Sequence, residues 1–211
     1  MTTSRRWVRA LLRFLGWSFL SFLIVLTVYL FVVRPWHIRW GATDEEVRRA
    51  MPGDENIPDA TLDTTRAITI QARPEEIWPW LVQMGSGRAG WYSYDRIDNG
   101  GHPSADHIIP ELQIPLKPGD MLTTNPHGFK IMAVEENHYL VLGPQISWAI
   151  ALYPQSDGST RLVERLHARY YWRRPMGIVW AIMLDVGDFI MMRNMLLNLK
   201  GRVEAQPRVG H

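Results

Sequence analysis

Three side chains between residues 95 and 111 are of the types that perform acid–base chemistry. Asp95, His107 and Glu111 lie on or near a long polar loop that we expect from residue 98 to 118. A histidine beside carboxylates can act as a general acid or base, and functional side chains often lie on loops. Asp95 can equally cap the turn that follows it. The three residues are therefore catalytic candidates, with ordinary loop polarity as the alternative.

Metal and cofactor chemistry finds no support in the sequence. His102 and His107 do not have the spacing of a metal-binding pair on one helix face, and no third ligand is evident. The chain has no cysteine, which excludes disulfides, thiolate metal sites and cysteine nucleophiles. It also lacks a glycine-rich phosphate loop and a nucleophile elbow. We expect neither a metal nor a cofactor.

Aromatic residues are concentrated in Trp91 to Asp95 (WYSYD), which we expect to be a strand. Alternation would place Trp91 and Asp95 on one face and Tyr92 and Tyr94 on the other. Such side chains either line a pocket for an apolar ligand or fill a core. Further candidates of the same kind are aromatic, aliphatic or thioether side chains on other expected elements, namely Trp148, Ile150, Met183 and Met191.

Glu164 is unusual because it falls on the apolar side of an expected strand, residues 160–172. Burying a carboxylate without a partner is costly. Glu164 therefore either contacts the polar group of a ligand or pairs with Arg66 or Arg88. The opposite side of the same strand is basic, and we expect it to be the solvated convex face of a sheet; it carries Arg161, Arg165, His167 and Arg169.

The elements that must position these residues form an α+β pattern. A strand is expected over 66–71, and a helix follows from Pro74, with a kink or break at Pro79. The later strands are separated by short turns, which indicates an antiparallel meander. These strands are expected at 121–124, 129–135, 139–142, 147–153 and 160–172.

A long apolar helix is expected from Met176 to Lys200, near the end of the chain. Asp185 and Asp188 lie in its middle, where charges would be costly in lipid. We therefore interpret it as a buried helix packed on the sheet and not as a membrane span.

Several stretches of the chain resemble bacterial members of the SRPBCC superfamily, which includes START domains and polyketide cyclases. They are Trp40–Thr43, Pro52–Asp54, Thr65–Ile68, Trp78–Gly85, Arg88–Asp95, Pro110–Gln113, Gly119–Asp120, Ser147–Trp148, and Thr160–Leu162 with Arg165. The resemblance implies a helix-grip (START-like) domain over residues 65–204. In that fold an antiparallel sheet wraps around a long C-terminal helix, and the cavity between them commonly holds an apolar small molecule.

The N-terminal region contains a candidate membrane anchor. Residues 14–33 form an uncharged apolar run of 20 residues, which as a helix would span a bilayer core of roughly 30 Å. A cleaved signal peptide would have a shorter core that ends at a small-x-small site, whereas this run ends in bulky residues. Residues 1–13 form a basic tail, which gives a slight preference for an external globular domain. Residues 34–64 are expected to be a connector with a short helix that begins at a Thr43/Glu46 capping box, and 205–211 a tail.

The charge distribution excludes nucleic acid as a partner of the folded part. Residues 1–33 hold four of the 23 basic residues and none of the 21 acidic ones. The remainder is therefore slightly acidic, without the basic excess that nucleic-acid binding needs.

The leading hypothesis is a single-pass membrane protein of a bacterium, whose START-like module binds a hydrophobic small molecule or lipid. A cyclase- or dehydrase-like enzyme that uses the acid–base candidates is the first alternative. An interaction domain without a pocket is the second.

Overall fold

The computed structural model describes residues 2–124, 128–170, 176–177, 181 and 183–206. Contacts between residues divide the chain into two compact units, Met1–Ile38 and Arg39–His211. The boundary falls inside the predicted connector. Most of that connector, from Arg39 onward, therefore belongs to the globular second unit.

The first unit is helical from Thr2 to His37. α1 (Thr2–Val28) continues into a π-helical turn, Tyr29–Val33, and then α2 (Arg34–His37). Within it, Ala10–His37 contains an 18-residue window with a mean hydropathy of 2.2, and it is the one helix of the described residues that is long and apolar enough to cross a membrane. Length and composition thus agree with the predicted span, and they are equally those of a signal sequence.

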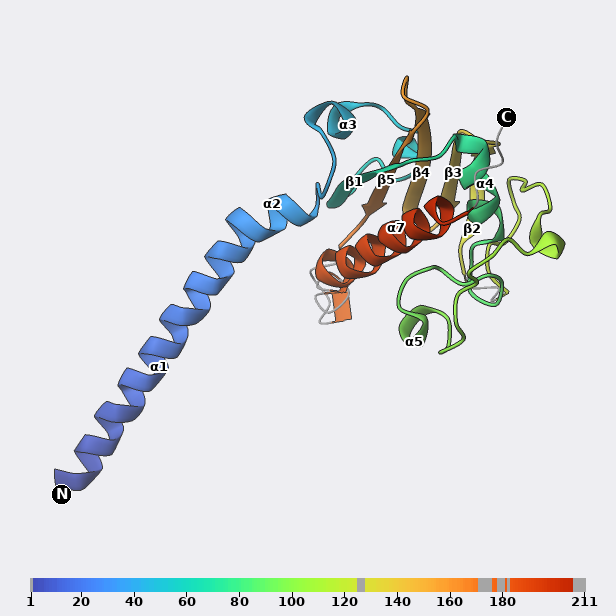
Figure 1. The fold of residues 1–211 in the computed structure, drawn as a ribbon. Helices are drawn as coiled ribbons and strands as arrows, with labels where there is room; N and C mark the ends of the chain where they lie inside the picture. Colours follow the sequence, from blue (N-terminus) through green and yellow to red (C-terminus); the bar gives the residue numbers. More distant parts are fainter. Residues whose placement is uncertain (1, 125–127, 171–175, 178–180, 182, 207–211) are drawn as a thin grey trace. The chain divides into compact units, whose positions relative to one another are not determined.

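The second unit contains a five-stranded antiparallel sheet with the order β1-β5-β4-β3-β2 (Figure 1). Strands β2 to β5 follow one another through short turns, and β1 pairs with β5 to complete the sheet. This confirms the predicted meander. The strands are β1 (Leu62–Ile70), β2 (Lys130–Glu135), β3 (Tyr139–Gly143), β4 (Ser147–Pro154) and β5 (Thr160–Ala168).

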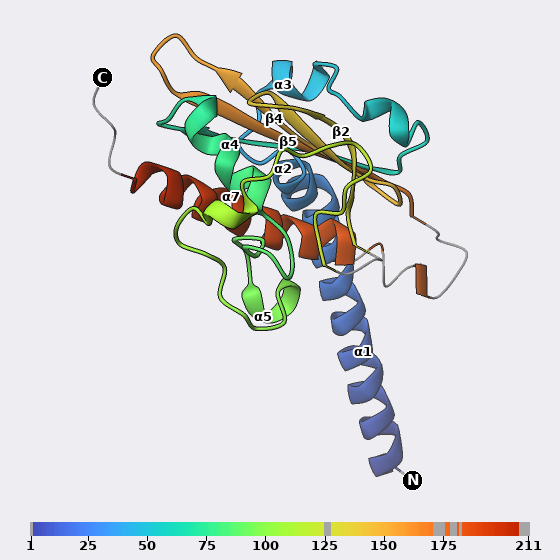
Figure 2. The same cartoon turned by 90° about the vertical axis from the view of Figure 1, so that its right-hand side faces the viewer.

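The sheet lies between a long helix and an N-terminal segment. Helix α7 (Asp188–Glu204) crosses one face, and α3 (Asp44–Arg48) covers the other (Figures 1 and 2). A π-helical turn, Met183–Gly187, leads into α7, while part of the predicted 176–200 helix lies outside the described residues. α4 (Pro74–Gln83) contacts both α7 and β4. The predicted α+β class with a C-terminal helix against the sheet is confirmed.

Two strand predictions were wrong. Trp91–Asp95 is not a strand, because Tyr92 adopts a left-handed backbone conformation with φ +58° that breaks the alternation. The short helix α5 (Asp95–Asp98) follows. Residues 121–124 make only a single bridge, between Met121 and Lys130. Of the kink or break predicted at Pro79, the break does not occur, because α4 continues past that residue to Gln83.

The face of β5 that carries Arg165 was predicted to be solvated, and this was wrong because the N-terminal segment covers it. Arg165 is 5% exposed, and its guanidinium donates to the backbone oxygens of Glu46, Val47 and Arg49 at 2.8–3.0 Å. It also pairs with Asp54 at 2.8 Å. The capping box between Thr43 and Glu46, predicted from the sequence, forms as expected. The backbone oxygens of Glu46, Val47 and Arg49 lie at the C-terminal end of α3, where a helix has no internal donors for its last carbonyl groups. Arg165 supplies these donors and thereby binds the N-terminal segment to the sheet.

We expect Arg165→Lys to lower the free energy of unfolding by about 1–2 kcal/mol, because a single ammonium cannot reproduce the planar fork of donors. Chemical denaturation of the full chain in mild detergent, followed by tryptophan fluorescence, measures the change. Arg169→Lys is the matched control. Its exposed pair with Asp59 should contribute less than about 1 kcal/mol. Equal effects of the two substitutions would contradict the role of Arg165.

Candidate functional site

The inner face of the sheet, beneath α7, carries a row of residues from three neighbouring strands. Register pairs Arg66 of β1 with Glu164 of β5, and Glu164 with Ile150 of β4. Because side chains alternate along a strand, Glu164 faces α7 while Arg165 faces α3. All three inner-row residues have no exposed surface. Two ionisable side chains, Arg66 and Glu164, are therefore built into an otherwise apolar layer.

The buried polar cluster consists of Arg66, Glu164 and Asp188, the first residue of α7. Arg66 Nη1 lies 2.7 Å from Asp188 Oδ2 and 3.4 Å from Glu164 Oε1. The ring of Phe189 packs 5.6 Å from the guanidinium carbon of Arg66, within the range of a cation–π contact. The sequence-based pairing of Glu164 with Arg66 is confirmed. Arg88, the other suggested partner, donates instead to the backbone oxygen of Val82.

Burial determines the protonation of this cluster. Desolvation raises the pKa of Glu164 to about 8, against the opposing effect of the Arg66 charge. Burial also raises the pKa of Asp188, and Arg66 again opposes the rise. At neutral pH, Glu164 is therefore mainly a neutral acid that can donate a hydrogen bond, while the shorter contact to Asp188 provides the main ion pair of Arg66.

Several buried polar atoms of the inner face have no hydrogen-bond partner among the residues that the structure describes. They include Thr64 Oγ1 on β1, and Glu164 Oε2 and Trp148 Nε1 on the neighbouring strands β5 and β4. In the β4–β5 register, Glu164 is opposite Ile150, which is two residues from Trp148 on the same strand face. Glu164 and Trp148 are therefore diagonal neighbours on the inner face. Buried polar groups normally have a protein, water or ligand partner. The pair therefore marks a place where a polar group of another molecule could bind.

An aromatic cluster adjoins this place. Trp91, Phe129 and Trp148 contact one another with ring centroids 5.4–5.7 Å apart, the geometry in which aromatic pairs attract. Tyr92 does not join the cluster, although it is adjacent to Trp91. Its ring packs against Trp80, and its hydroxyl donates to the Trp80 backbone oxygen.

The remaining predicted ligand contacts are distributed over different environments. Tyr94 and Met183 are exposed. Met191 is half-buried, and its backbone oxygen accepts a hydrogen bond from Ser93 Oγ at 2.9 Å. The predicted set thus separates into an inner group and an outer group. Trp91, Trp148, Ile150 and Glu164 form the inner group.

The structure does not bring Asp95, His107 and Glu111 together into one acid–base site. The Asp95 carboxylate accepts hydrogen bonds from the backbone nitrogen and hydroxyl of Ser104, which organises the loop. The His107 side chain is 73% exposed and pairs with Asp106, and Glu111 is exposed. No hydrogen bond or ion pair joins these three residues in the described parts of the chain. The loop interpretation of Asp95 fits this geometry better.

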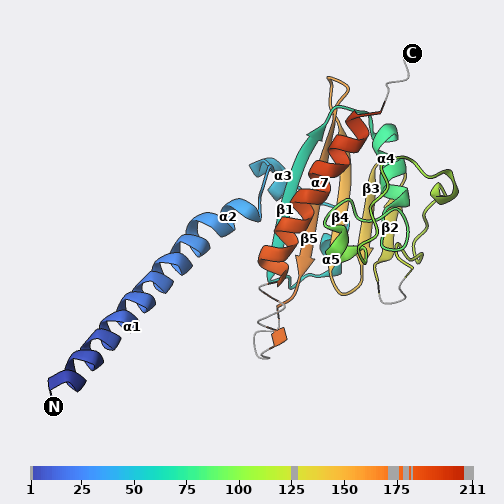
Figure 3. The same ribbon diagram turned by 60° about the horizontal axis from the view of Figure 1, so that its bottom comes forward.

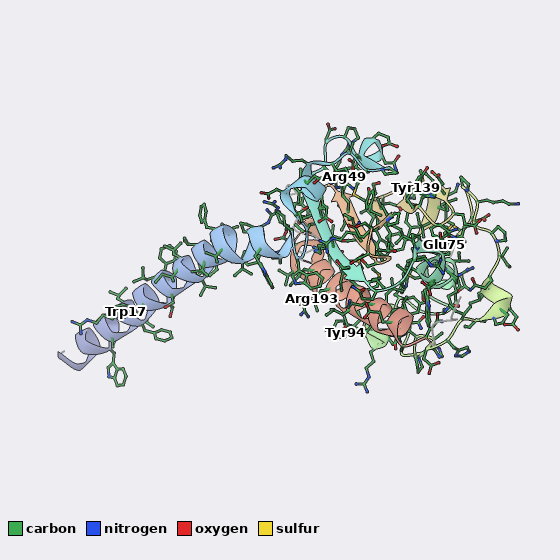
Figure 4. The ribbon with its side chains drawn as sticks, turned by 45° about the horizontal axis from the view of Figure 1, so that its top comes forward. Trp17, Arg49, Glu75, Tyr94, Tyr139 and Arg193 are labelled. Atoms are coloured by element: carbon green, nitrogen blue, oxygen red, sulfur yellow. The ribbon has the colours of Figure 1, made fainter. Side chains whose placement is uncertain are left out.

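A hollow of about 250 Å³ lies outside this region, beside the start of α4 and the β4–β5 turn. Arg73, Glu75, His138 and Gln155 are among its lining residues, and Glu75 is labelled in Figure 4. None of the predicted ligand residues lines it. Within the described residues, no group of three histidine, aspartate or glutamate side chains could hold a metal ion.

Sequence reasoning missed two contributors to the inner site. Asp188 was noted only as an obstacle to membrane insertion, and Phe129 was noted only as the start of a strand. An acidic residue within an apolar helix was the available signal for Asp188, because it needs a buried cation once the helix packs on a sheet. The proximity of Phe129 to Trp91 depends on tertiary structure and leaves no local pattern.

Comparison with protein families finds none that matches the chain, and no curated protein matches it. Solved structures with partial similarity include three structural genomics proteins. One from Nitrosomonas europaea is 15% identical, with 69% of this chain and 96% of that chain covered and a TM-score of 0.43. One from Mesorhizobium loti is 17% identical over 69% and 99%, with a TM-score of 0.40, and one from Rhodobacter sphaeroides is 14% identical over 75% and 99%, with a TM-score of 0.42. At such low identities and TM-scores, these similarities assign neither a family nor a function.

Proposed function

We propose that this chain is a membrane-anchored, non-catalytic binding module of the START-like, helix-grip type. Its ligand is a lipid or another hydrophobic small molecule with a polar group, bound between the sheet and α7. Ala10–His37 serves as the anchor, and the slight excess of arginine before the span favours a globular unit outside the cytoplasm.

The observation that carries the proposal is that Glu164 Oε2 and Trp148 Nε1, on neighbouring strands, are both buried and both without a hydrogen-bond partner among the described residues. A neutral Glu164 and an indole N–H are both hydrogen-bond donors. They suit a ligand acceptor such as an ester carbonyl or a hydroxyl oxygen. The aromatic cluster beside them would contact the apolar part of the same ligand.

The polar cluster also gives a physical reason why the site should prefer a ligand with an uncharged or weakly polar headgroup to an anionic one. Arg66 Nη1 already lies 2.7 Å from the Asp188 carboxylate, so the guanidinium charge has an anionic partner within the protein. A second anion would have to compete with that contact in a desolvated layer, where charge is costly. A neutral acceptor meets no such competition.

The direct test is identification of a bound molecule. The full chain, with an N-terminal tag, is recovered from alkaline-washed membranes, purified in mild detergent and analysed by native mass spectrometry and solvent extraction. We expect the tag to be retained and a small apolar molecule to be released in near-stoichiometric amount. Loss of the tag would contradict the anchor, because it would indicate a cleaved signal sequence.

Variants distinguish a specific site from adsorbed lipid. Trp148→Phe removes one of the two donors, and we expect the occupancy of the bound molecule to fall several-fold. Trp80→Phe is the matched control, because Trp80 is an equally buried indole without an Nε1 partner in the described structure but belongs to α4. Equal occupancy in wild type and both variants, or a wild-type protein with no bound molecule, would favour the interaction domain without a pocket.

A further inference from the structure

The outward side of the second unit carries a group of exposed apolar side chains. We define the docking face as Tyr94, Ile97, Met183, Val186, Ile190 and Leu197, which are 37–71% exposed. Ile190 and Leu197 recur seven residues apart on α7, opposite its buried residues Met195 and Leu199. Tyr94 and Ile97 come from the region of α5, far away in sequence. An apolar group of this kind on a soluble surface usually contacts another molecule.

Hydrogen bonds hold the α5 region, which carries one part of the docking face, against α7, which carries the other. Ser93 Oγ donates to the Met191 backbone oxygen, and Asn198 Nδ2 donates to the Tyr92 backbone oxygen, both at 2.9 Å. The segment before α5 is thereby fixed along α7, and Figure 3 shows α5 beside that helix. Tyr94 and Ile97 follow this fixed point directly. The surface is therefore held in place and is not formed by a separate loose loop.

The chain joins the second unit beside this surface. Arg39 is the first residue of the second unit, and the Trp40 ring packs 5.2 Å from the guanidinium carbon of Arg193 on α7. The Trp40 backbone oxygen also accepts a hydrogen bond from Ala67 of β1. Arg193 lies one turn from Ile190 on α7, and Figure 4 labels Arg193 on that helix and Tyr94 in the α5 region next to it. The first residues of the second unit therefore pack against α7, one helical turn from Ile190 of the docking face.

We propose that the docking face rests on the lipid bilayer that holds the anchor. This inference depends on the anchor of the proposed function but not on the internal ligand. The short connection keeps the second unit at the membrane surface, where apolar side chains can be buried in the interfacial region. Tyr94, Trp40 and Arg193 are residue types that favour this region, because each combines apolar surface with a polar end. Exposed Arg96 on α5 adds a charge that suits anionic phospholipid.

The absence of cysteine allows a clean test with the full chain. Ile97→Cys is labelled with an environment-sensitive fluorophore, and the protein is placed in nanodiscs of phosphatidylcholine and phosphatidylglycerol with one chain per disc. Ser156→Cys, on the exposed β4–β5 turn, is the matched control. We expect blue-shifted emission at position 97 and several-fold stronger quenching by lipids with a quencher in the upper acyl chain than at position 156.

A second variant tests the surface as a unit. Ile190→Glu should reduce the lipid quenching at position 97 to near the level of position 156, while the circular dichroism spectrum shows that the fold is kept. Equal quenching at 97 and 156 in the otherwise unchanged chain would overturn the proposal. Blue-shifted emission without lipid quenching would also overturn it, because the face would then be covered by protein. Loss of the chain from the discs would contradict the anchor itself.

Discussion

Replacing Arg66 by methionine should lower the free energy of unfolding by about 3–5 kcal/mol, because removal of one partner leaves a buried charge uncompensated. Arg66 has no exposed surface and is in contact with Asp188 and Glu164. Since globular domains are stable by only about 5–15 kcal/mol, the loss would be a large share of the total. Urea denaturation of the full chain in mild detergent measures it through tryptophan fluorescence.

Two further variants separate buried charge from lost packing. Arg73→Met removes an arginine whose contact with Glu76 is exposed, and it should cost less than about 1 kcal/mol. Combining Arg66→Met with Asp188→Asn and Glu164→Gln removes the buried charge as a group, so most of the lost stability should return. A single Arg66→Met variant as stable as wild type would show that the cluster is not the buried charge network described above.

The sheet could be predicted from the sequence because its signals are local. Alternation in β5 placed Glu164 on the apolar side and Arg165 on the other, and both placements are confirmed. Short turns gave the antiparallel order of β2 to β5. The capping box at Thr43 predicted the start of α3, since capping depends on residues three positions apart.

The errors arose where distant contacts override local pattern. The strand predicted at Trp91–Asp95 fails because Gln83 and Trp80 hold the Tyr92 hydroxyl from α4. Arg165 was predicted to be solvated because nothing in β5 shows that the segment after the candidate anchor folds back over it. A basic strand face with regular spacing is ambiguous, since it fits both water and the carbonyl groups of a covering helix.

The candidate site could be predicted from the sequence only where its signal was local. An acid among leucines indicated a buried partner, and the two arginines considered included the correct one. The third member, Asp188, belongs to a helix that begins more than twenty residues later, and only the packing of α7 brings it to Arg66. The predicted acid–base site was wrong for the opposite reason, because its residues are near in sequence but do not meet in the structure. Asp95, His107 and Glu111 are close in sequence, but the loop directs them to different partners.

The protonation of Glu164 should make the stability of the protein fall as the pH rises from about 5 to 8. The carboxyl has a pKa of about 8 in the folded chain, against an ordinary value of 4.5. Between these values the folded state keeps a proton that the unfolded state has lost, so folding takes up a proton and higher pH opposes it. One such group contributes a slope of up to about 1.4 kcal/mol per pH unit.

Glu164→Gln isolates this contribution. Glutamine keeps the shape and the acceptor that faces Arg66 but does not titrate, so the variant should lose about 2–3 kcal/mol less than wild type between about pH 5.5 and 7.5. His167 remains in both proteins and acts in the same direction, because its hydrogen bond with Asp63 raises its pKa and its stabilisation is lost as the pH rises. The comparison between variant and wild type removes that shared part. Parallel loss of stability in the two proteins would show that Glu164 is already ionised in the folded chain, and the neutral donor that the proposed ligand site requires would then be absent.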